Sequence, residues 1–258
     1  MIITRLMGGL GNQMFQYAYA RHLSIKLNIP FFIETSFYDN QQGNGVIREF
    51  ELHKFANTTR NNYEQIDNQG LFLQINEGIN VDIVSNIYNY ILNGYWQSEN
   101  YFKESESLIK DDFAPTEKQL AKIIRPELDT NTISLHVRRT DFANTNGNHP
   151  IQEISYYKNA IAEIGDYDNL LIFSDDIEWC KENFTFDNMI FVEGQDDVED
   201  LWLMSLCKNN IIANSSFSWW GAWLNNNPNK KVIAPNKWFC DENNINALEI
   251  IPKNWIKI

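Results

Sequence analysis

Short apolar runs alternate with segments of helical periodicity along most of the chain. An apolar run at residues 1–6 leads into a glycine-rich segment at 7–14, then into helical periodicity over 15–27 and a second apolar run at 30–34. This strand–turn–helix–strand order places the two strands parallel in one sheet with the helix on its face. The first part of the chain therefore predicts an α/β fold.

The same alternation returns in the second half of the chain. Strands are expected at 132–137, 169–173, 189–192, 210–213 and, as the last strand, 232–234, with helices at 155–164, 178–183, 198–207 and from 218 onward. Between these two parts, residues 36–80 are irregular, residues 81–97 carry scattered apolar and aromatic positions, and residues 100–124 look helical with a break at Pro115.

A domain boundary is expected between Arg125 and Pro126, because proline disfavours helix in the residue before it. Strand–helix alternation on both sides of this break predicts two Rossmann-like halves, residues 1–125 and 126–258, that face a central cleft. Ligands of such folds bind at the carboxyl ends of the strands. Polar residues that follow predicted strands are therefore the first candidates for a functional site.

Composition narrows the possible partners. The 258 residues carry a formal net charge of −13 with a sequence pI of about 4.7, which argues against nucleic acid as a partner. The three cysteines are widely spaced and form neither a zinc motif nor a disulfide framework. No apolar run has the length of a signal peptide or a membrane span. We expect a cytoplasmic protein with at most peripheral contact to a membrane, and the oligomeric state stays open.

Two adjacent arginines, Arg138 and Arg139, stand where a predicted strand ends, although the acidic chain has only seven arginines. A guanidinium is always charged, and its fork of donors matches a phosphate or a carboxylate. The pair therefore indicates a docking site for an anion. The alternative is a structural ion pair that only ties the strand to the next loop.

Strand geometry separates the roles of the two arginines. Alternate side chains of a strand face opposite ways, so the apolar side chains share one face and His136 lies with Arg138 on the other. We expect Arg138 to meet the anion, and Arg139 to pair internally with a carboxylate such as Asp141. The apolar face would consist of Ile133, Leu135 and Val137.

The glycine-rich segment from Gly8 to Gln13 follows the first strand and opens a helix. Glycines such as Gly9 and Gly11 let the backbone approach a phosphate, and helix N-termini attract anions. The segment has neither the dinucleotide-binding spacing nor the lysine of a P-loop. A plain tight turn explains it equally well.

Two further strand ends carry polar groups. Asp175 and Asp176 follow the strand at 169–173, where one could read the edge of a base such as guanine while the other caps the next helix. Ser215, Ser216 and Ser218 follow the strand at 210–213, where their hydroxyls can donate to phosphate oxygens. The simpler interpretation is a serine cap with a tryptophan-rich core, and we expect the tryptophans to be core.

These strand ends together point to a ligand with phosphates and a nucleobase. The chain shows no metal-ligand spacing, and the Asp-x-Asp of Asp166 and Asp168 precedes a strand, which favours a surface turn. The chain has neither a P-loop nor a nucleophile elbow. A nucleotide-sugar donor fits this combination of features.

Five motifs in this order resemble the α-1,2-fucosyltransferases of glycosyltransferase family 11. They are Gly8 to Ala18 (GGLGNQMFQYA), Gly94 to Gln97 (GYWQ), His136 to Asp141 (HVRRTD), Phe173 to Asp176 (FSDD) and Asn214 to Gly221 (NSSFSWWG). The resemblance runs from the first residues to about Leu224. The His-x-Arg-Arg-x-Asp element is also similar to that of α-1,6- and protein O-fucosyltransferases.

The resemblance implies a GT-B-like fold, GDP-fucose as donor, inversion at the anomeric carbon and no metal cofactor. By similarity, Arg138 binds the β-phosphate and steadies the leaving GDP, and Asp175 or Asp176 reads guanine. The first half lies on the acceptor side and the second half binds GDP-fucose. Further implied donor contacts come from His136, Ser215, Ser216, Phe217, Ser218, Gly9, Gly11, Asn12 and Asp200.

The expected reaction is transfer of L-fucose to the 2-hydroxyl of a terminal β-galactoside in surface-glycan biosynthesis. The identity of a base stays open: Asp141 is one candidate, and carboxylates of the first half are others (Glu34, Asp39, Glu99). Some α-1,6 relatives have a glutamate shortly after the arginine pair, but residues 142–146 contain no carboxylate. The alternatives are another linkage, another GDP-sugar, or a sugar-binding protein without catalysis.

Overall fold

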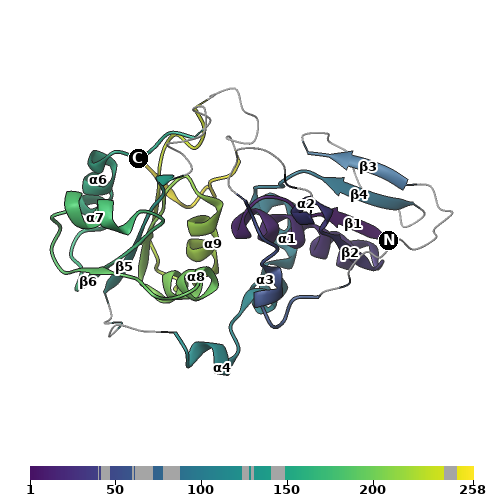
Figure 1. The fold of residues 1–258 in the computed structure, drawn as a ribbon, viewed down its shortest axis with the longest axis horizontal. Helices are drawn as coiled ribbons and strands as arrows, with labels where there is room; N and C mark the ends of the chain where they lie inside the picture. The colour runs from purple at the N-terminus through teal and green to yellow at the C-terminus, as the bar shows by residue number, and fades with distance from the viewer. Residues whose placement is uncertain are drawn as a thin grey trace. The chain divides into compact units, whose positions relative to one another are not determined.

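The computed structural model describes residues 1–39, 41, 47–59, 61, 72–77, 88–123, 128, 131–140, 149–240 and 249–258. The chain divides into two compact units, Met1–Ala114 and Pro115–Ile258, and each contains a parallel sheet (Figure 1). The α/β prediction is confirmed. The boundary expected at Arg125 lies outside the described residues.

The first unit is a four-stranded parallel sheet in the order β2-β1-β4-β3. Its strands are β1 (Ile2–Arg5), β2 (Phe31–Glu34), β3 (Phe72–Asn76) and β4 (Asn89–Asn93). Its helices are α1 (Leu10–Leu27), α2 (Ser36–Asp39), α3 (Glu106–Phe113) and the 3-10 turns η1 (Leu52–Lys54), η2 (Glu99–Tyr101) and η3 (Lys103–Ser105).

Helix α1 packs against the sheet and α3 through a buried aromatic cluster. The Tyr17 ring lies 5.5 Å from the Phe31 ring and 5.3 Å from the Phe113 ring. The Tyr17 hydroxyl and Arg21 Nε both donate to Asp112 Oδ2, at 2.8 and 2.9 Å. This buried carboxylate therefore ties α3 to α1.

Several elements of the first unit differ from the expectation, among them α1 and β3. Helix α1 begins at Leu10, five residues earlier than the periodicity indicates, because the Gly9 carbonyl accepts from the amides of Asn12 and Gln13. Strand β3 lies within the stretch expected to be irregular. Among the described residues it pairs with β4 alone, and Ile75 is the one buried residue of its five, so its apolar pattern is too weak to mark a strand.

The second unit is a six-stranded parallel sheet in the order β10-β9-β8-β5-β6-β7. Helices α6 and α7 lie on one face of this sheet, and α8 and α9 lie on the other (Figure 1). The strands are β5 (Thr132–Val137), β6 (Asn169–Ser174), β7 (Met189–Phe191), β8 (Asn209–Ile211), β9 (Val232–Ala234) and β10 (Ile256–Lys257). The helices are α4 (Glu117–Leu120), α6 (Ile154–Ile164), α7 (Ile177–Asn183), α8 (Asp197–Leu206) and α9 (Ser216–Leu224).

Strand β10 corrects the expectation that 232–234 is the last strand. Its two residues pair in parallel with β9, and a run this short leaves no apolar period in the sequence. The tryptophans of α9 are buried, as expected for core residues: Trp219 and Trp220 are 0% exposed and Trp223 is 4% exposed. No helix in the described part of the chain is long and apolar enough to cross a membrane.

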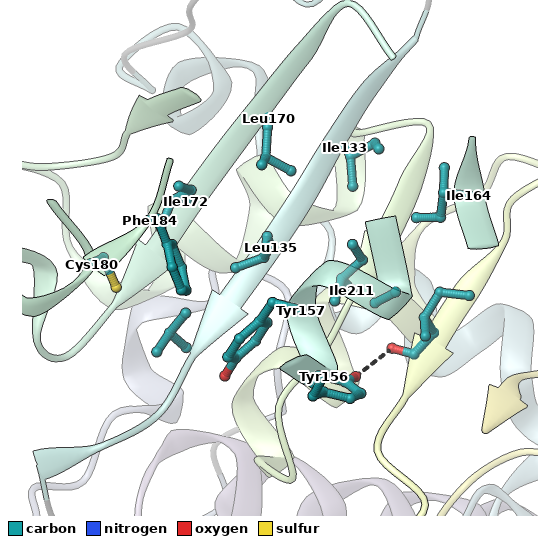
Figure 2. Packing of buried hydrophobic residues seen from close by; sticks show 13 residues of the cluster. Ile133, Leu135, Tyr156, Tyr157, Ile164, Leu170, Ile172, Cys180, Phe184 and Ile211 are labelled. Carbon is teal, nitrogen blue, oxygen red and sulfur yellow. Dashed lines mark hydrogen bonds between the residues drawn. The ribbon is translucent and has the colours of Figure 1, made fainter. Parts of the chain in front are cut away.

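Strand β5 lies in the middle of the larger sheet and is buried along its whole length. Its apolar side chains enter one cluster with α6 and α7, where Figure 2 shows Leu135 and Tyr157 close together. On the opposite face, Ser134 accepts a hydrogen bond from Asn210 Nδ2 at 2.7 Å, and the His136 ring lies 5.6 Å from that of Phe217. The predicted division of the strand into two faces is confirmed.

Candidate active site

The carboxyl ends of β8, β5 and β6 lie at the same edge of the larger sheet, because the three strands are adjacent and parallel. The segments that follow them hold the arginine pair, the two aspartates and the serine-rich turn. Sequence positions far apart are therefore brought to one edge, where ligands of doubly wound sheets bind.

Arg138 points toward the end of the neighbouring strand. Its Nε lies 3.3 Å from Asp175 Oδ2, and both side chains are about four-fifths buried, with 20% and 17% exposed. The same carboxylate accepts from the backbone amides of Arg139 at 2.9 Å and Thr140 at 3.1 Å, and from the Thr140 hydroxyl. Asp175 thus fixes the β5 end loop and the direction of the Arg138 guanidinium.

Arg139 leaves the strand toward α7 and packs there. Its guanidinium carbon lies 3.7 Å from the centroid of the Trp179 ring, and its Nε lies 3.6 Å from Asp176 Oδ2. The expected internal pairing of Arg139 is seen, with Asp176 as the carboxylate. Asp141, the partner named from the sequence, lies outside the described residues, as do residues 142–146.

Both aspartates already serve the scaffold. Asp176 is the N-cap of α7 and accepts from the Trp179 amide at 3.3 Å, while Asp175 holds the β5 end loop. These contacts match the capping interpretation for Asp176 and add a loop-holding role for Asp175. Recognition of a base by either residue stays a prediction, and it would have to use lone pairs that these contacts leave open.

The His136 imidazole is 4% exposed beside Arg138, and its Nδ1 has no hydrogen-bond partner within the described part of the chain. Burial, followed by the charge of Arg138, lowers the pKa of His136 to about 3, against an opposing effect of Asp175. The ring is therefore neutral at neutral pH. A buried ring nitrogen without a hydrogen-bond partner is rare in folded proteins and calls for an explanation, such as a catalytic role or a bound water or ion.

The serine-rich turn begins α9, with Ser215 at the N-cap position. Its side chain makes no capping hydrogen bond, and Ser218 Oγ donates to the Ser215 carbonyl at 3.4 Å. The simple capping interpretation is therefore not met by a side-chain contact. The first turn of α9, with Ser216 and Phe217 partly exposed, offers backbone amides of the kind that bind anions.

Asp200 lies on α8 among other carboxylates. Its Oδ1 accepts from Gln195 Nε2 at 3.4 Å. Burial, with repulsion from Asp197 and Asp196, raises the pKa of Asp200 to about 7. Its carboxyl group thus keeps its proton to a higher pH than an exposed aspartate does, while a role in donor binding stays a prediction.

In the first unit, the glycine-rich turn requires a positive φ at Gly8 and a close contact between Gly8 and the Asn12 side chain. Gly8 has φ +78°, and a Cβ placed there would lie 2.6 Å from Asn12 Nδ2. Gly9 precedes the helix, and Gly11 is buried in its first turn. Asn12 Oδ1 accepts from Gln97 Nε2 at 2.7 Å, so the first and second family-like motifs meet in space.

Sequence reasoning missed Glu77, which follows β3. Its carboxylate accepts from the amides of Tyr95 and Trp96, at 2.7 and 2.8 Å. Trp96 has φ +57°, a conformation that costs a bulky residue roughly 1–3 kcal/mol. No sequence signal reveals this contact, because only the pairing of β3 with β4 brings the carboxylate to the turn.

The described residues contain no group of three or more histidine, cysteine, aspartate or glutamate side chains that could hold a metal ion. The turn with Asp166 and Asp168 precedes β6 and exposes both carboxylates, as expected for a surface turn.

Comparison with known proteins gives consistent results. The model of glycosyl transferase family 11 matches residues 1–258. An α-1,2-colitosyltransferase of Escherichia coli is 34% identical over 289 aligned residues, covering 100% of this chain and 98% of that protein. The O-antigen biosynthesis glycosyltransferase WbnK of Escherichia coli is 32% identical, covering 98% of this chain and 99% of that protein.

The fold is shared with solved fucosyltransferases. The α-1,6-fucosyltransferase NodZ soaked with GDP-fucose aligns with a TM-score of 0.52 at 14% identity, covering 86% of this chain and 91% of that chain. NodZ from Bradyrhizobium gives a TM-score of 0.53 over 85% of this chain. These similarities show a GT-B-type α/β fold with two parallel sheets. Since the family model spans the whole chain and both full-length relatives exceed 30% identity, the chain belongs to glycosyl transferase family 11.

Proposed function

We propose that the protein transfers a 6-deoxyhexose, L-fucose in the first instance, from its GDP conjugate to the 2-hydroxyl of a terminal β-galactoside. The observation that carries the proposal is Arg138, held by Asp175 at the carboxyl edge of the sheet beside an unpaired, neutral His136. This arrangement suits an anionic leaving group. The family membership and a relative named for α-1,2 transfer support the reaction class.

In the proposed reaction, the acceptor oxygen forms a bond to C1 of the sugar while the bond from C1 to the β-phosphate oxygen breaks. Negative charge grows on the departing diphosphate, and the Arg138 guanidinium neutralises it. Fixed donors of this kind lower a barrier by about 3–4 kcal/mol each. The amides of the first turn of α9 and the hydroxyls of Ser215, Ser216 and Ser218 are proposed as further phosphate donors.

The proton of the acceptor hydroxyl must leave during this displacement. Candidate bases in the described part are Glu34, Asp39 and Glu99. Glu34 accepts from the Ser36 amide at 2.6 Å, and Glu99 accepts from Lys103 at 3.3 Å. An oxocarbenium-like C1 needs only a weakly activated nucleophile, so a solvated carboxylate is sufficient.

Colitose is the second candidate for the transferred sugar, because the relative at 34% identity is named for it. Colitose lacks one ring hydroxyl that fucose has. A site that hydrogen-bonds this hydroxyl would reject colitose by as much as about 10⁴-fold, whereas an apolar site would discriminate weakly. The donor is therefore decided by a direct comparison of the two sugar nucleotides.

The test is to incubate the protein with GDP-fucose or GDP-colitose and a panel of β-galactosides, with and without EDTA, and to determine the linkage of each product. The proposal expects an α-1,2 product with at least one of the two donors. A product of another linkage, or transfer from neither donor, would refute it. Tight GDP binding without any transfer would instead favour a sugar-binding protein without catalysis.

We propose that the protein acts on surface-glycan precursors at the cytoplasmic side of a membrane. The relative named for O-antigen biosynthesis supports this setting. Binding of the protein to vesicles of bacterial lipid, measured by flotation, would test for peripheral contact.

A further inference from the structure

The turn from Gly94 to Gln97 in the first unit has no part in the reaction proposed above, although it is one of the family-like motifs. It follows β4 and meets the end of β3 through one carboxylate. Glu77 Oε2 accepts from the Tyr95 amide at 2.7 Å and Oε1 accepts from the Trp96 amide at 2.8 Å. A Cβ at Gly94 would lie 2.5 Å from the Glu77 Cβ, so the carboxylate and the turn are in close contact.

Trp96 carries two unfavourable features at once. Its φ is +57°, and its indole Nε1 is buried without an acceptor among the residues that the structure describes. The ring is 2% exposed and packs 4.6 Å from Tyr19 and 5.3 Å from Tyr101. Such features persist only where the surroundings over-determine the backbone, and they gather at functional sites.

The residue after the strained tryptophan reaches the glycine-rich turn. Gln97 Nε2 donates to Asn12 Oδ1 at 2.7 Å. A second amide braces the same two turns, since Gln16 Nε2 donates to the Gly94 carbonyl at 3.1 Å and Gln16 Oε1 accepts from the Met7 amide at 3.0 Å. The strained turn and the glycine-rich turn are thus one hydrogen-bonded assembly.

This assembly fixes which way the Asn12 amide faces. Its oxygen accepts from Gln97, so its Nδ2 hydrogens point away from that contact. Nδ2 lies over Gly8, where a Cβ would approach to 2.6 Å, and it donates to no acceptor within the described residues. Asn12 is therefore presented as a hydrogen-bond donor and is only partly buried.

We infer that Glu77 and Gln97 are positioning residues, which hold Asn12 as a donor to an oxygen of a bound substrate. The inference rests on the proposed function and deepens it. The oxygen belongs either to the phosphates of the sugar nucleotide or to a hydroxyl of the acceptor sugar. Either oxygen can accept the hydrogen bond from Asn12 Nδ2, and the KM values for the two substrates distinguish them.

The first test compares two identical amide-to-carboxylate changes. Gln97→Glu places an acceptor opposite Asn12 Oδ1, so the Asn12 amide must turn its nitrogen toward residue 97. It then no longer presents an N–H group to the substrate. Gln74→Glu is the matched control, because Gln74 Nε2 donates to Asn76 Oδ1 at 2.9 Å on the exposed side of β3. We expect Gln97→Glu to lower kcat/KM by about ten- to one-hundredfold and Gln74→Glu to leave it unchanged.

The second test removes the donor without disturbing the assembly. Asn12→Asp still accepts from Gln97 but has no N–H to give, so we expect a loss of kcat/KM like that of Gln97→Glu. A rise in the KM for the sugar nucleotide identifies a phosphate as the partner, and a rise in the KM for the galactoside identifies a hydroxyl. Wild-type kinetics in Asn12→Asp would overturn the inference.

The third test addresses Glu77. Glu77→Gln turns an NH₂ group toward one of the two turn amides, so hydrogen exchange at Tyr95 or Trp96 should accelerate together with a fall in kcat/KM. The double variant Glu77→Gln/Gln97→Glu should be no worse than the poorer single variant, because both act through Asn12. Fully additive losses would mean that Glu77 acts independently of Asn12 and would overturn its assignment.

Calorimetric titration of the same variants with GDP-fucose and with lactose separates this inference from the proposed function. A wild-type protein that binds either ligand without transfer refutes the function alone, and the variants still test the Asn12 donor by their affinity. Equal affinities of Gln97→Glu and Gln74→Glu for both ligands would overturn the positioning role.

Discussion

Exchanging Arg138 and Arg139 separately for alanine should give opposite results, although the two residues are adjacent. Arg138 lies at the strand end beside Asp175 and the unpaired His136 nitrogen, whereas Arg139 stacks on Trp179. We expect Arg138→Ala to lose transfer activity while the protein stays folded. We expect Arg139→Ala to lose stability and keep most of its activity below its melting temperature.

The structure sets the size of each effect. Loss of one preorganised donor to a growing oxyanion costs about 3–4 kcal/mol of barrier, or a hundredfold or more in kcat. Arg139 gives up a cation–π contact at 3.7 Å, worth about 0.5–2 kcal/mol, and a partly exposed ion pair with Asp176 worth about 0–1 kcal/mol. The expected fall in melting temperature for Arg139→Ala is about 3–6 °C.

The assay measures kcat with saturating sugar nucleotide and acceptor, together with thermal unfolding of each purified variant. Lys181→Ala is the control, because it removes a cation of α7 whose partners, Glu178 and Glu193, are exposed. Normal turnover in Arg138→Ala would refute the role of its guanidinium. Equal losses of activity in both arginine variants would refute the division of roles between the two faces of β5.

Three further predictions concern stability. The His136 pKa of about 3 lies below the unfolded value of 6.5, so the unfolded chain binds more protons between them and stability is lost as the pH falls through this range. His136→Gln should flatten that loss by about 1.4 kcal/mol per pH unit in urea unfolding between about pH 6 and pH 4, and an unchanged slope would contradict it. The Asp200 pKa of about 7 lies above the unfolded value of 3.8, so the folded protein holds an extra proton and loses stability as the pH rises toward 7. Asp200→Asn should therefore stabilise the protein by about 1–2 kcal/mol near pH 8 and by nothing near pH 4, and a gain independent of pH would contradict burial and the Asp197 charge as the cause. A Cβ at Gly221 would lie 2.9 Å from Cβ and Sδ of Met204, so Gly221→Ala should cost about 1–3 kcal/mol by overpacking α8 against α9. An unchanged melting temperature would show that the two helices separate without strain.

Local sequence patterns predicted most elements of the second unit. Strands β5, β6 and β9 and helices α6 and α8 agree with the expected ranges within one residue, because each combines a strong apolar period with a clear end signal. The patterns failed at β3 and β10, which are an edge strand with one buried residue and a two-residue strand. Such elements exist through hydrogen bonds to a neighbouring strand, and their own side chains carry little information about them.

The candidate site divides in the same way. The sequence identified the arginine pair, the strand-end aspartates and the serine-rich turn, and strand alternation separated Arg138 from Arg139. It did not identify Trp179 as the stacking partner of Arg139, nor the hold of Asp175 on the Thr140 backbone. These partners lie about 35 to 40 positions away along the chain.

By itself, the sequence determined the α/β class, the family and which residues can bind an anion, because these depend on local periodicity and on the chemistry of single side chains. Only the tertiary structure decided that Asp175 orients Arg138, that His136 is buried and neutral, that Glu77 accepts from the Trp96 amide, and that Gln97 donates to Asn12. The physical reason is that hydrogen-bond direction and pKa depend on which distant segments the parallel strands bring together, and on how much water their packing excludes.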